Sequence, residues 1–243
     1  MTLFFGILRG GGVIFDRMKI IAHIKTDFPT KFGIPRQSGL VEELQGLIIF
    51  EPAYRQPEAF RGLEEFSHIW LLWEFSEAKR GRFRATVKPP RLGGKARMGV
   101  FATRAPFRPN PIGLSCVRLL EVRWDEAYGT MLVVAGADLM DGTPIYDVKP
   151  YLPYADAHPG ARSGFGGQVK EHALAVSFPE ELLSRLPLEK RAAAVGFLRQ
   201  DPRPGVHGEK ARVYKAAFAG FDIHFAVDGE QLTVVDVVRM ETC

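Results

Sequence analysis

Cysteine is scarce in this chain of 243 residues, which holds only Cys116 and the terminal Cys243. Two cysteines this far apart exclude a disulfide framework and a CxxC metal site, and they are typical of a reducing cytoplasm. Long apolar runs are missing too, since no stretch approaches the roughly 20 residues that span a bilayer. With 46% hydrophobic and 25% charged residues, the composition predicts an ordinary soluble globular protein without a membrane partner.

The common signatures of nucleotide, metal and hydrolase sites are also absent. The sequence has no GxGxxG after a strand, no GxxxxGK(S/T), no HExxH and no GxSxG. Its six histidines are scattered, so we expect no metal. Any cofactor must then be held by an unusual arrangement of loops.

Short apolar runs rich in Val, Ile, Leu, Phe and Trp dominate the first two thirds of the chain. No helical pattern of crossover length alternates with them, which favours an antiparallel barrel or sandwich over a doubly wound sheet. One short helix is expected around QPEAFRGLEEF, residues 56–66. The expected strands cover residues 19–25, 46–50, 66–75, 96–103, 113–124 and 130–139.

A change of composition at YADAHPGARSGFGG, residues 154–167, predicts a linker. We therefore expect a domain over 18–160 and a small α+β domain over 168–243. In the latter, a helical stretch over 179–200 contains Pro187, which should start a second helix or kink the first. Residues 1–17 are interpreted as an N-terminal extension, with Met18 as the native start.

Positive charge is concentrated in one segment, although the net charge is only +4. From Lys79 to Arg108 the chain has ten Lys or Arg residues and no Asp or Glu. Such a block attracts polyanions, and release of condensed counterions gives affinity for nucleic acid. A merely solvated basic loop is the alternative.

The end of this segment, TRAPFRPNPIGLS at residues 103–115, holds three prolines. Proline fixes φ and removes a backbone donor, so the stretch should be a rigid loop. Arg104, Arg108 and Asn110 alternate with the prolines and suit a phosphate, a carboxylate or a base edge. The loop could equally just turn a corner, and Arg108 could simply pin it to a carbonyl.

Acidic side chains gather in DLMDGTPIYDVKPY, residues 138–151. Asp138 follows an apolar strand and is well placed to accept hydrogen bonds from a ligand hydroxyl or amine. Asp141 precedes Gly142, which is typical of a tight turn. Asp147 and Lys149 share a strand face and could form a structural ion pair.

Three stretches together, PRQSGL (35–40), ARMGVFATRAPFRPNPIGLS (96–115) and DLMDGTPIYDVKPYLPYA (138–155), resemble the TsaA-like proteins. Bacterial and archaeal members of that family are tRNA (adenine-37-N6)-methyltransferases. The similarity covers about 18–160, and DPRPGVHG at 201–208 resembles the C-terminal extension of longer bacterial members. It implies a mainly β fold in which an antiparallel β-barrel binds S-adenosylmethionine, followed by the small α+β domain.

The same resemblance implies a homodimer that methylates N6 of N6-threonylcarbamoyladenosine at position 37 of tRNA. Ala105 departs from the family, whose members often have Ser there. The implied cofactor site consists of Gln37, Ser38, Gly39, Leu40, Ser76, Glu77, Arg104, Leu114, Ala135, Gly136, Ala137 and Asp138.

Catalytic and RNA-binding roles follow from the substrate that the resemblance implies. The acceptor is a poorly nucleophilic ureido nitrogen that should need a base, for which Asp138, Asp141 and Asp147 are the candidates. Arg104 or Arg108 would pair with the threonyl carboxylate, and Asn110 could hydrogen-bond the base or that carboxylate. The residues expected to contact RNA are Lys79, Arg80, Arg82, Arg84, Arg108 and Arg203.

Two functions of other classes remain open at this point. A non-catalytic RNA-binding module would keep the basic block without depending on a cofactor. A methyltransferase for a small molecule would use the barrel and could dispense with the basic block. The C-terminal domain could add RNA contacts or only support the dimer.

Overall fold

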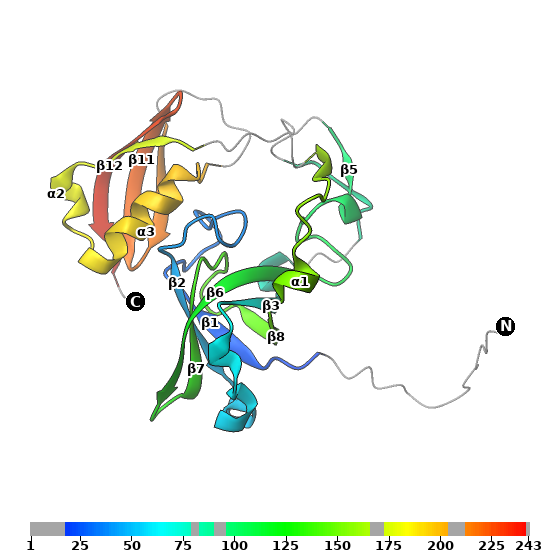
Figure 1. The fold of residues 1–243 in the computed structure, drawn as a ribbon. Coiled ribbons are helices and arrows are strands. Elements are labelled where there is room, and N and C mark those ends of the chain that lie inside the picture. Colours follow the sequence, from blue (N-terminus) through cyan, green and yellow to red (C-terminus); the bar gives the residue numbers. More distant parts are fainter. Residues whose placement is uncertain (1–17, 79–82, 90–95, 166–172, 204–211, 242–243) are drawn as a thin grey trace.

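The strands of the first domain close into a six-stranded barrel in the computed structural model, which describes residues 18–78, 83–89, 96–165, 173–203 and 212–241 (Figure 1). All neighbouring strands of the barrel are antiparallel, in the order β1-β2-β7-β6-β3-β8. The predicted antiparallel barrel is therefore confirmed. The strands are β1 (Ala22–Lys25), β2 (Gln45–Phe50), β3 (His68–Glu74), β6 (Ile112–Asp125), β7 (Gly129–Ala135) and β8 (Pro144–Pro150).

Alternation along the strands builds the barrel core. In β3, Ile69, Leu71 and Trp73 are buried while the residues between them are partly exposed. Leu71 lies opposite Ser115 of β6 and Val148 of β8, so its side chain enters the interior between both neighbours. The period of two that marked these runs in the sequence thus becomes one buried face.

The helix expected over residues 56–66 is replaced by short 3-10 turns. These are η1 (Pro52–Tyr54), η2 (Pro57–Phe60) and η3 (Leu63–Glu65). Prolines start the first two, and Gly62 adopts a left-handed φ of 85° before the third, which breaks any continuous helix. Phe60 nevertheless packs edge-on against Phe50 of the barrel, with 4.8 Å between the ring centroids.

A two-stranded arm extends from the barrel between β3 and β6 (Figure 1). The strand expected over 96–103 is much shorter, because the chain curls around the carbonyl of Val100 after Gly99. That oxygen accepts hydrogen bonds from the hydroxyl of Thr103 at 2.8 Å and from the guanidinium of Arg108 at 3.0 Å. The elements of this region are η4 (Ser76–Ala78), β4 (Thr86–Val87), β5 (Met98–Gly99) and η6 (Val100–Ala102), and α1 (Pro153–Asp156) follows β8.

The C-terminal unit is a four-stranded sheet of order β10-β11-β12-β9 packed against helices. Pro187 immediately precedes α3 and so starts a second helix, as one of the two sequence alternatives has it. In α3 the buried residues are Ala193, Ala194, Phe197 and Leu198. The elements are β9 (Ala175–Ser177), α2 (Glu180–Leu183), α3 (Leu188–Arg199), β10 (Val213–Phe218), β11 (Phe221–Asp228) and β12 (Gln231–Arg239). No helix among the described residues is long and apolar enough to cross a membrane.

The segment between β1 and β2 joins the two units. Phe28 is buried in the core of the C-terminal unit, where its ring centroid lies 5.5 Å from that of Phe197 and 5.3 Å from that of Phe218. Asp27 forms an ion pair of 2.7 Å with Lys190 of α3. Figure 1 shows this segment rising from the barrel toward α3. The segment between β1 and β2 therefore contributes Phe28 to the hydrophobic core of the C-terminal unit, which is distinct from the core of the barrel.

Replacing Phe28 with Ala should lower the free energy of unfolding by about 3–5 kcal/mol, because it opens a cavity among buried aromatic rings. Denaturant titration followed by far-ultraviolet circular dichroism measures the loss. The exposed Leu188 is the matched control, and its replacement with Ala should cost no more than about 0.5 kcal/mol. Equal, small losses for both variants would contradict the place of Phe28 in the core of the C-terminal unit.

Candidate active site

The residues of the implied cofactor site gather at one end of the barrel. There β3 and β7 end while β6 and β2 begin, because neighbouring strands are antiparallel. The amide of Phe75, just after β3, donates to the carbonyl of Pro111 at 2.8 Å, which joins the end of β3 to the proline-rich loop. This contact brings Ser76 and Glu77, in the turn η4, beside the start of β6.

Two glycines bring residues 37–40 against the end of β7. The amide of Gly39 donates to the carbonyl of Gly136 at 2.9 Å, and the amide of Gly136 donates to Leu44 at 2.8 Å. Both glycines have a positive φ, 78° and 74°. A Cβ on Gly136 would lie 3.1 Å from the Cα of Gly39. This close approach requires glycine, and it leaves Leu40 exposed beside the strand end.

Asp138, two residues after Gly136, is the acceptor at the end of a hydrogen-bond chain. The indole Nε1 of Trp73 donates to Ser115 Oγ at 2.9 Å, and Ser115 Oγ donates to Asp138 Oδ1 at 2.6 Å. Ser115 is fully buried. One carboxylate oxygen is therefore fixed from inside the barrel.

Burial raises the pKa of Asp138 above the ordinary value of an aspartate. Hydrogen bonds from Ser115 and from the backbone amides of Asp138 and Ser38, together with the charge of Arg104, oppose this rise without cancelling it. The carboxyl group is thus more basic than usual while remaining oriented by fixed donors. A group of this kind can hold a ligand donor or accept a proton.

Arg104 links the proline-rich loop to the glycine loop. Its Nη1 donates to the side-chain oxygen of Gln37, whose own amide nitrogen donates to the carbonyl of Arg36. The rest of the Arg104 side chain is exposed. The geometry places a cation at the rim, close enough to Asp138 to lower the pKa of that carboxyl group.

Arg108 holds the proline-rich loop in shape. Its Nη1 donates to the carbonyls of Val100 and Thr103 at 3.0 and 2.8 Å. Its guanidinium carbon lies 5.5 Å from the ring centroid of Phe101. The alternative in which Arg108 pins the loop to carbonyl groups therefore describes this geometry. Asn110 is exposed, and its side chain makes no hydrogen bond to the described part of the chain.

Asp141 and Asp147 have partners outside the implied cofactor site instead. Asp141 Oδ1 accepts from the amide of Thr26 at 2.9 Å in a turn where Gly142 has a φ of 74°. Asp147 forms a 2.8 Å ion pair with Lys149. Of the three candidate bases, Asp138 is the one hydrogen-bonded to other residues of the site.

Sequence reasoning missed the inner support of the site. Ser115 and Trp73 were not singled out, although a serine facing inward between Gly113 and Val117 in an apolar strand is a signal of a buried polar contact. A second missed pair is Tyr146, whose hydroxyl donates to Glu74 at 2.6 Å. Burial and this carboxylate raise the pKa of Tyr146 to about 12.

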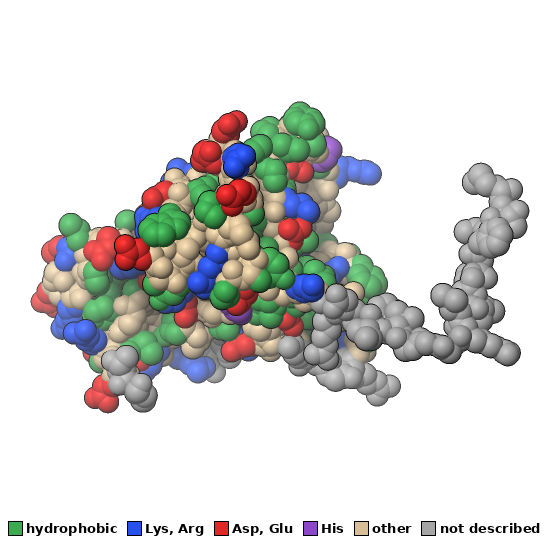
Figure 2. All heavy atoms as spheres, turned by 90° about the horizontal axis from the view of Figure 1, so that it is seen from below, with side chains coloured by type: hydrophobic (Ala, Val, Ile, Leu, Met, Phe, Trp, Pro, Cys, Tyr) green, Lys and Arg blue, Asp and Glu red, His purple; other side chains and the backbone are tan. Residues whose placement is uncertain are grey.

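The predicted RNA-binding residues are only partly described. Lys79, Arg80 and Arg82 lie outside the described residues, whereas Arg84 is exposed beside β4. Figure 2 shows a face on which acidic and basic side chains are mixed. The basic segment, which has cations and no acidic residue, differs in composition from this mixed surface.

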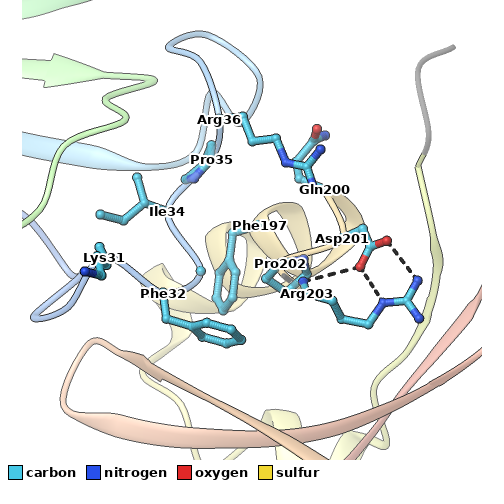
Figure 3. Close-up of a pocket in the computed structure, with 11 residues that line it drawn as sticks. Lys31, Phe32, Ile34, Pro35, Arg36, Phe197, Gln200, Asp201, Pro202 and Arg203 are labelled. Atoms are coloured by element: carbon cyan, nitrogen blue, oxygen red, sulfur yellow. Dashed lines mark hydrogen bonds and ion pairs between the residues drawn. The ribbon is translucent and has the colours of Figure 1, made fainter. Parts of the chain in front are cut away.

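Arg203 lies on the C-terminal side of a cavity of about 290 Å³ between the 31–36 loop and the end of α3 (Figure 3). Its guanidinium forms a two-pronged pair with Asp201, at 2.7 and 2.9 Å. Phe32 and Phe197 line the same cavity. No group of His, Cys, Asp and Glu side chains in the described part of the chain could hold a metal ion.

Comparison with known proteins identifies the family. The model of the tRNA-methyltransferase O N-terminal domain matches residues 23–157, and that of the TrmO C-terminal domain matches 171–240. The chain belongs to the tRNA-methyltransferase O family. The resemblance inferred from the three motifs and the predicted enzyme class are thereby confirmed.

Individual members of the tRNA-methyltransferase O family agree with this assignment. The tRNA (adenine(37)-N6)-methyltransferase of Escherichia coli (strain K12) is 42% identical over 215 residues, 85% of this chain and 91% of the relative. A Pyrococcus abyssi protein named for S-adenosyl-L-methionine binding is 37% identical over 145 residues, 60% of this chain and 73% of its own. A crystal structure of TrmO from Pseudomonas aeruginosa superposes with a TM-score of 0.74 at 34% identity, covering 97% of this chain and 100% of that chain.

The raised pKa of Asp138 predicts a pH-dependent stability. The folded protein holds this proton more tightly than the unfolded chain, so the contribution of Asp138 to stability falls as pH rises through its folded pKa. Relative to Asp138→Asn, the wild type should therefore lose stability between the ordinary aspartate pKa and the raised one. Denaturant titrations of both proteins across the acidic range measure the difference, and a pH-independent difference would contradict the assignment.

Proposed function

We propose that this protein transfers the methyl group of S-adenosylmethionine to N6 of N6-threonylcarbamoyladenosine at position 37 of tRNA. The observation that carries the proposal is the convergence of three loops at one barrel end. There the Gly39–Gly136 contact, the partly buried carboxylate of Asp138 and the exposed cation of Arg104 meet in a chain of the tRNA-methyltransferase O family.

The lining of this end suits S-adenosylmethionine. Leu40 and Leu114 expose 44% and 54% of their surface there, which offers apolar walls to an adenine ring. Asp138 can accept hydrogen bonds from a ribose hydroxyl or an amine, and Gly39 borders open space, since a Cβ on it would meet no atom within 4 Å. The residues that would hold the cofactor are Gln37, Ser38, Gly39, Leu40, Ser76, Glu77, Arg104, Leu114, Ala135, Gly136, Ala137 and Asp138. When bound, the cofactor supplies a methyl group on a positively charged sulfur.

The protein's own part in the reaction is alignment and proton handling. The acceptor nitrogen is poorly nucleophilic because its lone pair is delocalised, so removal or polarisation of its proton helps the transfer. Asp138 suits that role, since its pKa is raised and the Trp73–Ser115 chain fixes its orientation. The rigid loop around Arg108 keeps the rim from moving during alignment.

Arg104 is the proposed partner of the threonyl carboxylate. Gln37 holds it through one nitrogen, and the exposed remainder of the guanidinium can reach a carboxylate at the rim. Asn110, which is exposed on the same loop, can add a hydrogen bond to the base or the carboxylate. Asp141 and Asp147 are weaker candidates for the base because each already serves a local contact.

We further propose that the tRNA is held by Lys79, Arg80, Arg82, Arg84, Arg108 and Arg203, and that the protein acts as a homodimer in the cytoplasm. The acid-free segment supports the RNA contact. The family resemblance is the basis for the dimer, and the scarcity of cysteine supports a reducing compartment.

Methyl transfer should depend on the threonylcarbamoyl group. The purified protein, given labelled S-adenosylmethionine, should label tRNA that carries this group on adenosine 37 and leave otherwise identical unmodified tRNA unlabelled. Scintillation counting and nucleoside analysis by mass spectrometry measure the product. Equal labelling of both tRNAs, or of neither, would refute the proposed substrate.

Arg104→Ala should reduce methyl transfer about 100-fold or more, because a charge that aligns the substrate carboxylate is lost. The melting temperature should change little, since the side chain is exposed. Arg61, also exposed but placed among the 3-10 turns, is the matched control, and Arg61→Ala should keep full activity. Loss of stability together with activity in Arg104→Ala would instead indicate a structural arginine.

A further inference from the structure

Two phenylalanines of the arm are exposed to an unusual degree. Phe83, just before β4, exposes 53% of its surface, and Phe101, in η6, exposes 72%. Their rings stack on one another with 6.4 Å between centroids and 29° between planes. Large aromatic side chains bury most of their surface in folded proteins, so an exposed stacked pair is typical of an interaction site.

Basic residues lie near this aromatic pair in space or in the sequence. The guanidinium of Arg108 lies 5.5 Å from the ring centroid of Phe101, and Arg84 follows Phe83 directly in the chain. Arg97, just before β5, donates a 3.0 Å hydrogen bond to the hydroxyl of Thr86 in β4. No acidic residue occurs between 79 and 108 in the sequence. A protein or lipid surface would also meet the aromatic rings, but the uniform positive charge favours a polyanion.

Residues next to the two phenylalanines are anchored by burial and by backbone hydrogen bonds. Val100, which precedes Phe101, is buried, and its amide donates to the carbonyl of Ala85 at 2.9 Å. The carbonyl of Val100 accepts from Arg108. Both phenylalanines are thus anchored by buried or hydrogen-bonded neighbours, and little ordering is needed before a ligand binds.

We propose that Phe83 and Phe101, with Arg108, form a stacking platform for an unpaired base of the tRNA anticodon loop beside nucleotide 37. This inference rests on the proposed function, because it takes tRNA as the substrate. Proteins bind single-stranded nucleic acid by combining aromatic faces with a cationic groove, and the arm has both. The platform is joined to the rim through residues 100–104, so a base stacked on Phe101 helps to place nucleotide 37 near Arg104.

The test compares Phe83→Ala, Phe101→Ala and the aromatic replacement Phe101→Trp. Each alanine variant should weaken binding of a 17-nucleotide anticodon stem-loop RNA roughly tenfold, whereas Phe101→Trp should retain affinity. Affinity for S-adenosylmethionine and the melting temperature should stay at wild-type values. Trp124, exposed by 64% near the end of β6, is the matched control, and Trp124→Ala should bind RNA normally.

Salt dependence separates stacking from charge. The slope of log affinity against log salt should be unchanged in Phe101→Ala, because no phosphate contact is lost, and should flatten in Arg84→Ala. Unchanged RNA affinity in both phenylalanine variants would overturn the platform. A shift from dimer to monomer in sedimentation, without a loss of RNA affinity, would overturn it too, because it would assign these rings to a subunit interface.

The outcomes also separate this inference from the proposed function. If the wild type methylates threonylcarbamoylated tRNA and the phenylalanine variants bind and methylate it equally well, the platform fails and the proposed function stands. If the wild type binds the stem-loop through these rings but methylates no tRNA, the proposed function fails and the platform stands.

Discussion

The segment between β1 and β2 must satisfy two hydrophobic cores at once. Ile24, in β1 just before this segment, is buried in the barrel, while Phe28, four residues later, is buried against Phe197 in the C-terminal unit. The chain then returns to the barrel, where Gly39 hydrogen-bonds Gly136. The loop between β1 and β2, which forms one wall of the candidate site, therefore packs against both units. The C-terminal unit thus helps to position a site that is distant from it in sequence.

Opposing electrostatic effects determine the pKa of Asp138. Burial raises its pKa, while the Ser115 hydroxyl, two backbone amides and Arg104 stabilise the charged form. The carboxyl group is more basic than an exposed one and yet has a single orientation. The two arginines of the proline-rich loop have different surroundings. Arg108 donates to backbone carbonyls within the loop, whereas Arg104 lies at the rim and donates to Gln37. The prolines restrict the backbone of this loop and so keep both arginines in these positions.

The sequence predicted most of the strands, because alternating β-branched and aromatic residues have few other uses. Barrel closure came from the family resemblance, since strand patterns alone fit a sandwich equally well. The helix expected at 56–66 failed because prolines and the left-handed Gly62 outweigh local helix propensity. The Trp73–Ser115 bond depends on the register between β3 and β6, and the burial of Phe28 depends on how two units pack. Neither is encoded in any local pattern.

The role proposed for the basic segment depends on how the residues within and beside it are anchored. Charge alone would attract any part of a tRNA, and attraction without geometry does not select one nucleotide among many. In this arm, however, the buried Val100 and the carbonyl contacts of Arg108 hold Phe101 and Arg104 in one rigid stretch. In the complex that we propose, an RNA loop attracted by the cations meets an aromatic surface at a set separation from the rim. In that proposed complex, nonspecific affinity and specific placement come from the same residues, because the loop proposed to bind the RNA is also the loop proposed to align it.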